Sequence, residues 1–545
     1  MVVRAPPNVK LGLVRGAEDQ KLTWLRIVHF LFLVVPRLLI FSPLRTLWHR
    51  VLYRKFSANV QLLGRTGLAD FVTNLAQYIL SHCDAAQARI LFDRVKSYER
   101  IWSQSPYLKN DKAWLSRVEV NGTAGRWIAR PGTDRSKDDV VVYFIHGGGF
   151  VVDTGSNAQE ILASVVKEFN IKRDVQVSVF CLDYRLAPEY KYPSQLVEVM
   201  AGYQYLVNTV GIPERKILLG GDSAGGNLAT AFLLHLARPA PEIKTPKELG
   251  DVPGRPAAAL LISPMVNLVS RARSYDTNAS YDFIYSSSAL RVACDYIGVP
   301  PPPGSEISYL RFNPLKWFTL PSFKFPRGLM DGQVEPRDRA WQGWKGAELF
   351  KVPYINPSIV EDDAWWKEAC PPNGNTAVVW GGKEIFADDD EALYHTLGRA
   401  GVEPTKIYAE LRAHDWILHD WNVPTSWKTK AKGPDNDPYY GFNSICDMIE
   451  RVRKETNGGS LSSSSSPSGR KALPVRTDKA IRSTGKNSTT AAQASSDHDK
   501  EMYADVAASA ASIADDAVVV NEGEGEINHL KSSMGESGVL VERAE

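Results

Sequence analysis

The chain has 545 residues, of which 44% are hydrophobic and 23% charged, and its formal net charge at pH 7 is +2. This composition is ordinary for a globular protein, and the nearly neutral balance gives no indication of nucleic-acid binding. The five cysteines stand far apart without a C-x-x-C pair, so the sequence predicts neither a disulfide framework nor a zinc site. We expect no metal and no organic cofactor.

An interrupted apolar stretch lies near the N-terminus. Residues 27–35 are apolar except for His29, and after Pro36 and Arg37 the apolar character resumes over residues 38–41. Basic residues and tryptophans flank it: Trp24, Arg26, Arg45, Trp48, Arg50, Arg54 and Lys55. A membrane-spanning helix needs about 20 apolar residues, so this stretch indicates a marginal span or a helix lying in the lipid interface. The alternative is a helix buried against the rest of the chain. We assign residues 1–56 to a membrane-associating segment, with residues 23–56 making the contact.

The central part of the chain alternates between strand and helix patterns. Helical periodicity over residues 57–110 predicts N-terminal helices. Short β-favouring runs then predict two strands within 116–130 and further strands at 139–145, 176–182, 216–220, 257–262, 376–380 and 405–410, with helices between them. This order is typical of an α/β fold, with a mostly parallel central sheet and helices on both faces.

Two motifs in this region indicate chemistry. The first is Gly221-Asp222-Ser223-Ala224-Gly225, which lies between a buried strand pattern and a buried helix pattern and is a G-x-S-x-G nucleophile elbow. A serine on such a sharp turn stands clear of the backbone, and the glycines permit the close backbone approach that the turn requires. The second is His146-Gly147-Gly148-Gly149, directly after an apolar strand pattern. Its N–H groups can point into a cavity without side chains in the way.

The two motifs together predict a serine hydrolase acting on a carbonyl ester. Ser223 is the expected nucleophile, and the N–H groups of Gly148, Gly149 and Ala224 are the expected oxyanion donors. We expect His146 to fasten the loop together with Gly147, rather than to act as the catalytic base.

These motifs resemble the hormone-sensitive-lipase branch of the α/β-hydrolase fold. The matching residues are His146 to Phe150, Asp183-Tyr184-Arg185-Leu186-Ala187-Pro188-Glu189, Gly221 to Asn227, and Leu261-Ile262-Ser263-Pro264. Their order and spacing are those of the family over residues 110–450. The resemblance implies an α/β-hydrolase fold with a helical cap, to which the N-terminal helices contribute. Within that branch the chain is similar to fungal membrane-associated esterases, including sterol-acetate deacetylases. This implies an intracellular membrane, the endoplasmic reticulum, or else the cytoplasm, as its location.

The family order of the triad is serine, acid and histidine, which directs attention to the last two predicted strands. His414 follows the 405–410 strand closely and is the expected base, whereas His419 would lie in the next helix. Glu384 occupies the position at which the family usually has aspartate, and glutamate can also orient the imidazole and stabilise the imidazolium. Asp388 is the alternative acid, although Asp388, Asp389 and Asp390 also suit the start of a helix.

The remaining segments define the expected domain organisation. The catalytic domain spans residues 111–455, with a cap insertion at about 265–370 that is rich in proline and aromatic residues and would shape an apolar pocket. The alternative for this insertion is surface decoration or contact with a partner. Residues 456–545 include a serine run and lack tryptophan and phenylalanine, so we expect a disordered tail.

The sequence favours a carboxylic-ester hydrolase that acts on lipophilic esters through an acyl-enzyme intermediate. A catalytically silent small-ligand binder with the same fold is one alternative, and a thioesterase or peptidase is another. The sequence does not indicate the acyl or alcohol group of the substrate or the oligomeric state.

Overall fold

The computed structural model describes residues 10–17, 23–47, 112–302, 344–419, 433–437 and 439–458, together with isolated residues and short stretches between 71 and 110. Most of the expected N-terminal helices at 57–110, residues 303–343 of the expected insertion, and nearly all of the expected tail from residue 456 onward lie outside the described residues.

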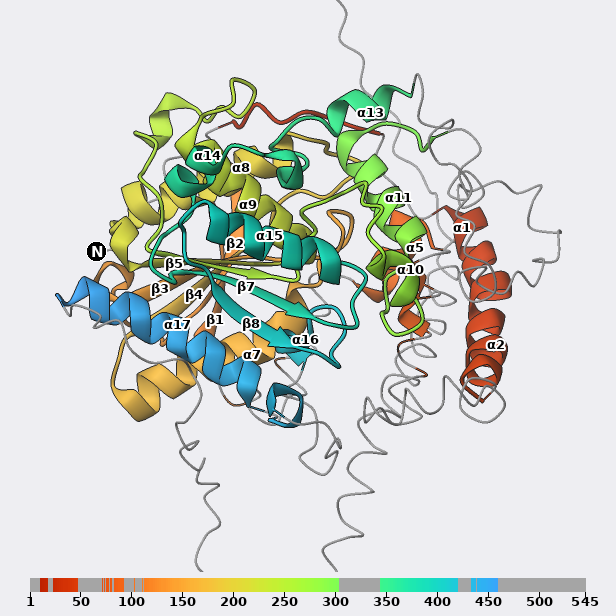
Figure 1. Ribbon diagram of the computed structural model, residues 1–545, viewed down its shortest axis with the longest axis horizontal. Coiled ribbons are helices and arrows are strands. Elements are labelled where there is room, and N and C mark those ends of the chain that lie inside the picture. The colour runs from red at the N-terminus through yellow and green to blue at the C-terminus, as the bar shows by residue number, and fades with distance from the viewer. Residues whose placement is uncertain are drawn as a thin grey trace, which may run out of the picture. The chain divides into compact units, whose positions relative to one another are not determined.

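An eight-stranded sheet forms the centre of the catalytic region (Figure 1). Its order is β1-β2-β4-β3-β5-β6-β7-β8, with antiparallel pairing of β1 with β2 and of β2 with β4, and parallel pairing elsewhere. The expectation of a mostly parallel α/β sheet is therefore confirmed. The strands are β1 (Leu115–Val120), β2 (Thr123–Ile128), β3 (Val140–Ile145), β4 (Val177–Leu182), β5 (Ile217–Asp222), β6 (Ala258–Ile262), β7 (Thr376–Gly381) and β8 (Thr405–Ala409).

The strand order places the two motif loops side by side. After β3 the chain runs outward to β4 and then returns to form β5 on the other side of β3. Because β3 and β5 are parallel neighbours, with Ile145 paired to Gly221, the loops that follow them leave the same edge of the sheet. Such a reversal of strand order is where open α/β sheets bind their ligands.

Helices cover both faces of the sheet (Figure 1). Alternate residues of the strands belong to two separate buried apolar clusters, as expected for parallel strands that are covered on both sides. One cluster contains residues of α7 (Gly155–Lys167), α16 (Trp416–His419) and α17 (Tyr440–Thr456). The other contains residues of α8 (Ser194–Gln204), α9 (Ser223–Ala237), α14 (Asp363–Ala369) and α15 (Ala387–Arg399).

The described part of the expected insertion contains α10 (Ser274–Thr277), α11 (Ser286–Ile297), α13 (Lys345–Leu349) and α14. Val292 of α11 packs against Gly149, and Phe150 stacks on Tyr296 with ring centroids 3.9 Å apart. In contrast, Trp366 of α14 is fully buried in the same cluster as α9. The insertion therefore contributes both to the surroundings of the glycine loop (residues 146–149) and to the body of the domain.

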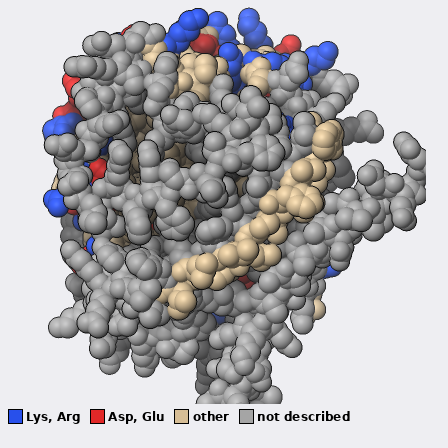
Figure 2. All heavy atoms as spheres, turned by 90° about the vertical axis from the view of Figure 1, so that its right-hand side faces the viewer, with Lys and Arg blue, Asp and Glu red and all other residues tan. Residues whose placement is uncertain are grey.

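The N-terminal apolar stretch forms a helical run made of α1 (Trp24–His29), a π-helical turn (Phe30–Val34) and α2 (Val35–Leu47). Figure 2 looks at this side of the molecule, where a diagonal band of residues other than Lys, Arg, Asp and Glu is visible. Six large apolar side chains on the run are more than half exposed: Trp24, Phe32, Leu39, Ile40, Leu44 and Leu47. Among the residues that the structure describes, no helix combines the length and apolar character needed to cross a bilayer.

The start of this helical run is connected, through α5 (Ala85–Leu91), to the segment that directly follows the glycine loop. Arg26 lies 3.0 Å from Asp84, and the side-chain amide of Gln87 donates to the carbonyl of Arg26. From the same helix, Arg89 donates to the carbonyl of Val151 over 2.8 Å and pairs with Glu189. The membrane-associating segment expected from the sequence is thus connected by polar contacts to the loop that follows β3.

Candidate active site

Ser223 lies at a strained turn between β5 and α9. Its φ is +52°, in the left-handed region that side chains other than glycine rarely adopt, and it is almost fully buried. The neighbouring glycines are required by close contacts. A Cβ on Gly225 would lie 2.0 Å from the carbonyl oxygen of Ile145, and a Cβ on Gly221 would lie 2.4 Å from the carbonyl oxygen of Gly225. The turn therefore depends on the absence of these two side chains.

The glycine loop faces the start of α9. Gly148 and Gly149 have φ values of +105° and +59°, and the N–H of Gly147 donates to the carboxylate of Asp222 over 2.9 Å. No acceptor in the described part of the chain engages the N–H groups of Gly148 and Gly149. The N–H of Ala224 is one of the donors that a helix leaves unpaired at its N-terminus. These three N–H groups remain the candidate donors to an anion.

His146 lies beneath the glycine loop rather than beside Ser223. Its ring stacks on Tyr184 with centroids 4.2 Å apart, and its Nδ1 lies 2.6 Å from the carbonyl oxygen of Gly147. The hydroxyl of Tyr184 donates to the carbonyl of His146. Asp153 lies 3.6 Å from the same ring and 3.9 Å from the buried guanidinium of Arg126. This arrangement suits a residue that supports the loop.

His414 lies in the turn between β8 and α16 and is almost fully buried. Its Nδ1 is 3.1 Å from the Oε2 atom of Glu384, whereas Nε2 has no hydrogen-bond partner among the described residues. The next residue, Asp415, donates its N–H to the hydroxyl of Ser263 at the end of β6. Because Asp222 pairs with Ile262, Ser223 and Ser263 follow paired residues of neighbouring strands, and this contact brings the His414 turn to the elbow. His419 is the last residue of α16.

Glu384 is fully buried in the loop between β7 and α15, which we call the acid loop (residues 382–386). Its Oε1 atom accepts from the N–H of Gly381 over 3.0 Å, so one oxygen is fixed by the backbone while the other faces His414. Asp388 is exposed in the first turn of α15 and accepts from the N–H of Ser274. The structure therefore places Glu384, and not Asp388, against the imidazole.

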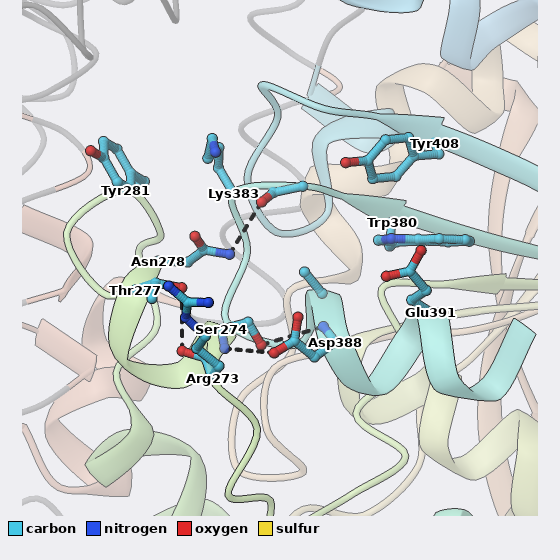
Figure 3. Close-up of a pocket in the computed structure, with 12 residues that line it drawn as sticks. Arg273, Ser274, Thr277, Asn278, Tyr281, Trp380, Lys383, Asp388, Glu391 and Tyr408 are labelled. Atoms are coloured by element: carbon cyan, nitrogen blue, oxygen red, sulfur yellow. Dashed lines mark hydrogen bonds between the residues drawn. The ribbon is translucent and has the colours of Figure 1, made fainter. Parts of the chain in front are cut away.

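Residues of the insertion hold the acid loop, as Figure 3 shows in part. The side-chain amide of Asn278 donates to the carbonyls of Gly382 and Glu384, and the hydroxyl of Ser274 donates to the carbonyl of Ile385. Asp282 is fully buried and accepts from the N–H of Ile385 over 2.7 Å. Sequence reasoning did not single out these three residues for this role, because they match no motif and their partners are about a hundred positions away.

An open cavity of 390 Å³ lies beside the acid loop and is lined by Asn278, Tyr281, Gly382, Lys383 and Asp388 among others (Figure 3). Its lining includes neither Ser223 nor His414. It borders the outer side of the loop that holds Glu384, so we do not assign it to the reacting group of a substrate.

Buried acidic groups surround the imidazole. Burial opposes a charge on His414, but the carboxylate of Asp415 and the hydrogen bond to Glu384 outweigh this and raise its pKa to about 10. Burial raises the pKa of Asp222 to about 7, partly offset by the N–H of Gly147. Burial likewise raises the pKa of Asp282 to about 6, against the favourable charge of His414. The site thus contains several acids that hold or release a proton near neutral pH.

The arrangement has the parts needed for acyl transfer. A hydroxyl stands on a sharp turn, and an imidazole oriented by a carboxylate lies in a turn that Ser263 ties to the neighbouring strand. The described residues contain no group of three or more His, Cys, Asp or Glu side chains arranged to hold a metal ion. All five cysteines are buried and free.

Comparison with known proteins identifies relatives of this chain. Residues 141–330 match a family model described as the α/β-hydrolase fold. The esterase LipU of Mycobacterium tuberculosis is 30% identical over 291 residues, which cover 53% of this chain and 73% of that protein. An esterase of Acinetobacter venetianus is 29% identical over 192 residues, covering 35% of this chain and 54% of that protein. The hormone-sensitive lipase of Mus musculus is 37% identical over 100 residues, which cover 18% of this chain and 12% of that protein. The match thus spans about half the length of the Acinetobacter protein.

A single methyl group added at Gly225 tests the elbow. We expect Gly225→Ala to destabilise the domain and to displace Ser223, because the added Cβ overlaps the carbonyl of Ile145 in closely packed backbone. Thermal denaturation followed by circular dichroism measures the effect. Gly398→Ala in α15 is the matched control, since its Cβ meets nothing within 4 Å, and we expect it to be neutral or to stabilise by up to about 1 kcal/mol. Equal melting temperatures for the two variants would contradict the close contact at the elbow.

Proposed function

Since the chain belongs to the hormone-sensitive-lipase-like branch of the α/β-hydrolase family, we propose that it is a serine hydrolase of carboxylic esters. The observation that carries this proposal is the placement of His414 by Glu384, over 3.1 Å, beside the turn on which Ser223 stands. A domain that only bound a ligand would not need an acid, an imidazole and a strained serine together.

In the proposed mechanism, Ser223 attacks the ester carbonyl while His414 takes its proton through Nε2. Glu384 keeps the imidazole in the tautomer that carries a proton on Nδ1 and stabilises the imidazolium as it forms. His414 then returns the proton to the departing alcohol, leaving the acyl group on Ser223. Water activated by the same imidazole releases the acid and restores the serine.

The tetrahedral intermediate carries a negative oxygen, for which we propose the N–H groups of Gly148, Gly149 and Ala224 as donors. Their support is positional: the positive φ values of the two glycines turn the loop backbone, and Ala224 lies in the first turn of α9. Loss of one such donor typically costs about 3–4 kcal/mol in the transition state. The stacked His146 and Tyr184 would keep the loop from reorganising during the reaction.

A lipophilic substrate is favoured by apolar side chains that pack near the imidazole. The rings of Phe283 and Phe386 meet the ring of His414 edge-on, at centroid distances of 5.5 and 5.0 Å. Val292 packs on the glycine loop from the insertion. Apolar groups around a reacting carbonyl bind acyl or alcohol moieties of similar character, so we propose esters with a bulky apolar part as the substrate class.

Active-site labelling tests the triad. We expect a fluorophosphonate to label the wild-type chain and to fail on Ser223→Ala and His414→Ala, because the hydroxyl is a poor nucleophile without its base.

Glu384→Gln should lower ester hydrolysis by about a thousandfold or more while leaving the melting curve nearly unchanged, since a triad without its acid loses imidazole orientation.

Asp388→Asn is the matched control, because Asp388 contacts Ser274 and not the imidazole. A strong loss in this control, with full activity in Glu384→Gln, would move the acid to Asp388. A folded wild-type chain that takes no label would instead favour a silent ligand binder. Thioesters included in the substrate panel would separate a thioesterase from an esterase.

We also propose that the helical run from Trp24 to Leu47 attaches the chain to an intracellular membrane by lying in the lipid interface. The run is about 36 Å long at 1.5 Å per residue and exposes six large apolar side chains. Its charge is complementary to anionic lipid. Between residues 20 and 69 the sequence has no Asp or Glu but eight basic residues: Lys21, Arg26, Arg37, Arg45, Arg50, Arg54, Lys55 and Arg65. Each basic residue close to an anionic surface contributes about 1 kcal/mol.

Vesicle co-sedimentation tests this attachment. We expect the wild-type chain to bind vesicles of phosphatidylcholine with phosphatidylserine more tightly than vesicles of phosphatidylcholine alone, and added salt to reduce the difference. The double variant Phe32→Glu, Leu39→Glu should lose binding to both. Ile171→Glu, which changes a similarly exposed apolar side chain on the catalytic body, should bind as the wild type does. Unchanged sedimentation of the double variant would refute the attachment.

A further inference from the structure

A second carboxylate lies on the opposite side of the imidazole from Glu384. The Oδ2 atom of Asp415 is 3.2 Å from Nε2 of His414, the nitrogen through which a triad histidine serves its serine. Both side chains are almost fully buried. His414 is therefore flanked by Glu384 at Nδ1 and by Asp415 at Nε2.

The backbone, and not a role in capping a helix, accounts for the position of this carboxylate. Asp415 has a φ of +54°, and its N–H is fixed by the hydroxyl of Ser263 while its carbonyl accepts from the N–H of Leu418. Although Asp415 directly precedes α16, its Oδ1 atom is buried without a hydrogen-bond partner among the described residues. A helix-capping aspartate would use its carboxylate on the N–H groups of the first turn.

We propose that Asp415 is a positioning residue that holds the Nε2 side of His414 and sets the pH at which the imidazole becomes free to act on Ser223. This inference rests on the proposed hydrolase function. While Asp415 is ionised and His414 is protonated, the proton on Nε2 is held by the charge of the carboxylate 3.2 Å away, without an aligned hydrogen bond. Nε2 then has no lone pair to accept the proton of Ser223. Loss of one proton from the pair releases Nε2, so the nucleophile is activated as the pH rises.

The other acids that face this pair come from four different elements. They are Glu384 on the acid loop, Asp282 after α10, Asp222 at the end of β5 and Asp390 in α15. Burial together with Asp222, Glu384 and Asp282 raises the pKa of Asp415 well above its usual value, against the favourable charge of His414. In turn, burial lowers the pKa of His414, and the charge of Asp415 is the largest of the contributions that raise it. Removal of that charge should therefore lower the pKa of the imidazole.

The experiment measures the rate of fluorophosphonate labelling of Ser223 against pH. Asp415→Asn keeps the shape of the side chain and removes its charge. We therefore expect the midpoint of the rise in labelling rate to shift to lower pH by at least about one unit. At a pH below both midpoints this corresponds to a tenfold larger fraction of unprotonated imidazole. Asp389→Asn is the matched control, because Asp389 is a half-buried acid nearby that contacts Ser270 and Asn267. Its profile should keep the wild-type midpoint.

A purely structural role for Asp415 gives a different result. The labelling rate of Asp415→Asn would then fall by the same factor at every pH, with an unchanged midpoint, and the inference would be overturned. NMR titration of the His414 imidazole in the Ser223→Ala background provides a measurement that does not require activity. There, Asp415→Asn should lower the pKa of His414 even if the wild-type chain proves not to label, and an unchanged imidazole titration would refute the role of Asp415 by itself.

Discussion

The close approach of two backbone segments organises the whole site. The first turn of α9 lies so near the end of β3 that Gly225 has no room for a side chain against the carbonyl of Ile145. At the same turn Ser223 adopts its left-handed conformation, and a Cβ on Gly147 of the glycine loop would lie 3.0 Å from the Cβ of Ser223. The close approach of Gly225 to Ile145 is possible because β5 pairs directly with β3. The geometry of the nucleophile therefore depends on the topology of the sheet.

The histidine and its acid are held by a second set of contacts. Ser263 ties the His414 turn to β6, while Asn278 and Asp282 tie the acid loop to the insertion. The imidazole is therefore positioned from both sides by segments that precede it by more than a hundred residues. Asn278, Asp282 and Ser263 are buried, where an unpaired polar group is costly, and this favours a single arrangement of the loops.

The fold and the motif residues could be read from the sequence because their signals are local. The strands were visible as apolar runs, the α/β architecture is confirmed, and the roles of Ser223, His414 and Glu384 remain predictions to which the geometry gives support. Asn278 and Asp282 could not be found in this way, because their function depends on which distant loop they meet. Asp415 adjoins His414 in the sequence, but only its positive φ turns its carboxylate back toward the ring. Whether residues 24–47 are buried or exposed was equally beyond pattern reasoning, since both outcomes need an apolar helix.

The tie between the first helix and the glycine loop limits where this chain can be shortened. Arg26 pairs with Asp84 ahead of α5, and Arg89 of α5 holds the carbonyl of Val151, whose own N–H donates to Gly148. A recombinant fragment that begins after residue 92, chosen to remove the apolar N-terminus and improve expression, would also remove a brace of the loop assigned to the oxyanion. Purified catalytic fragments of that kind would report on a loosened site. Residues 14–17 also bond to the backbone of residues 188–191, so trimming is better confined to the residues before Lys10.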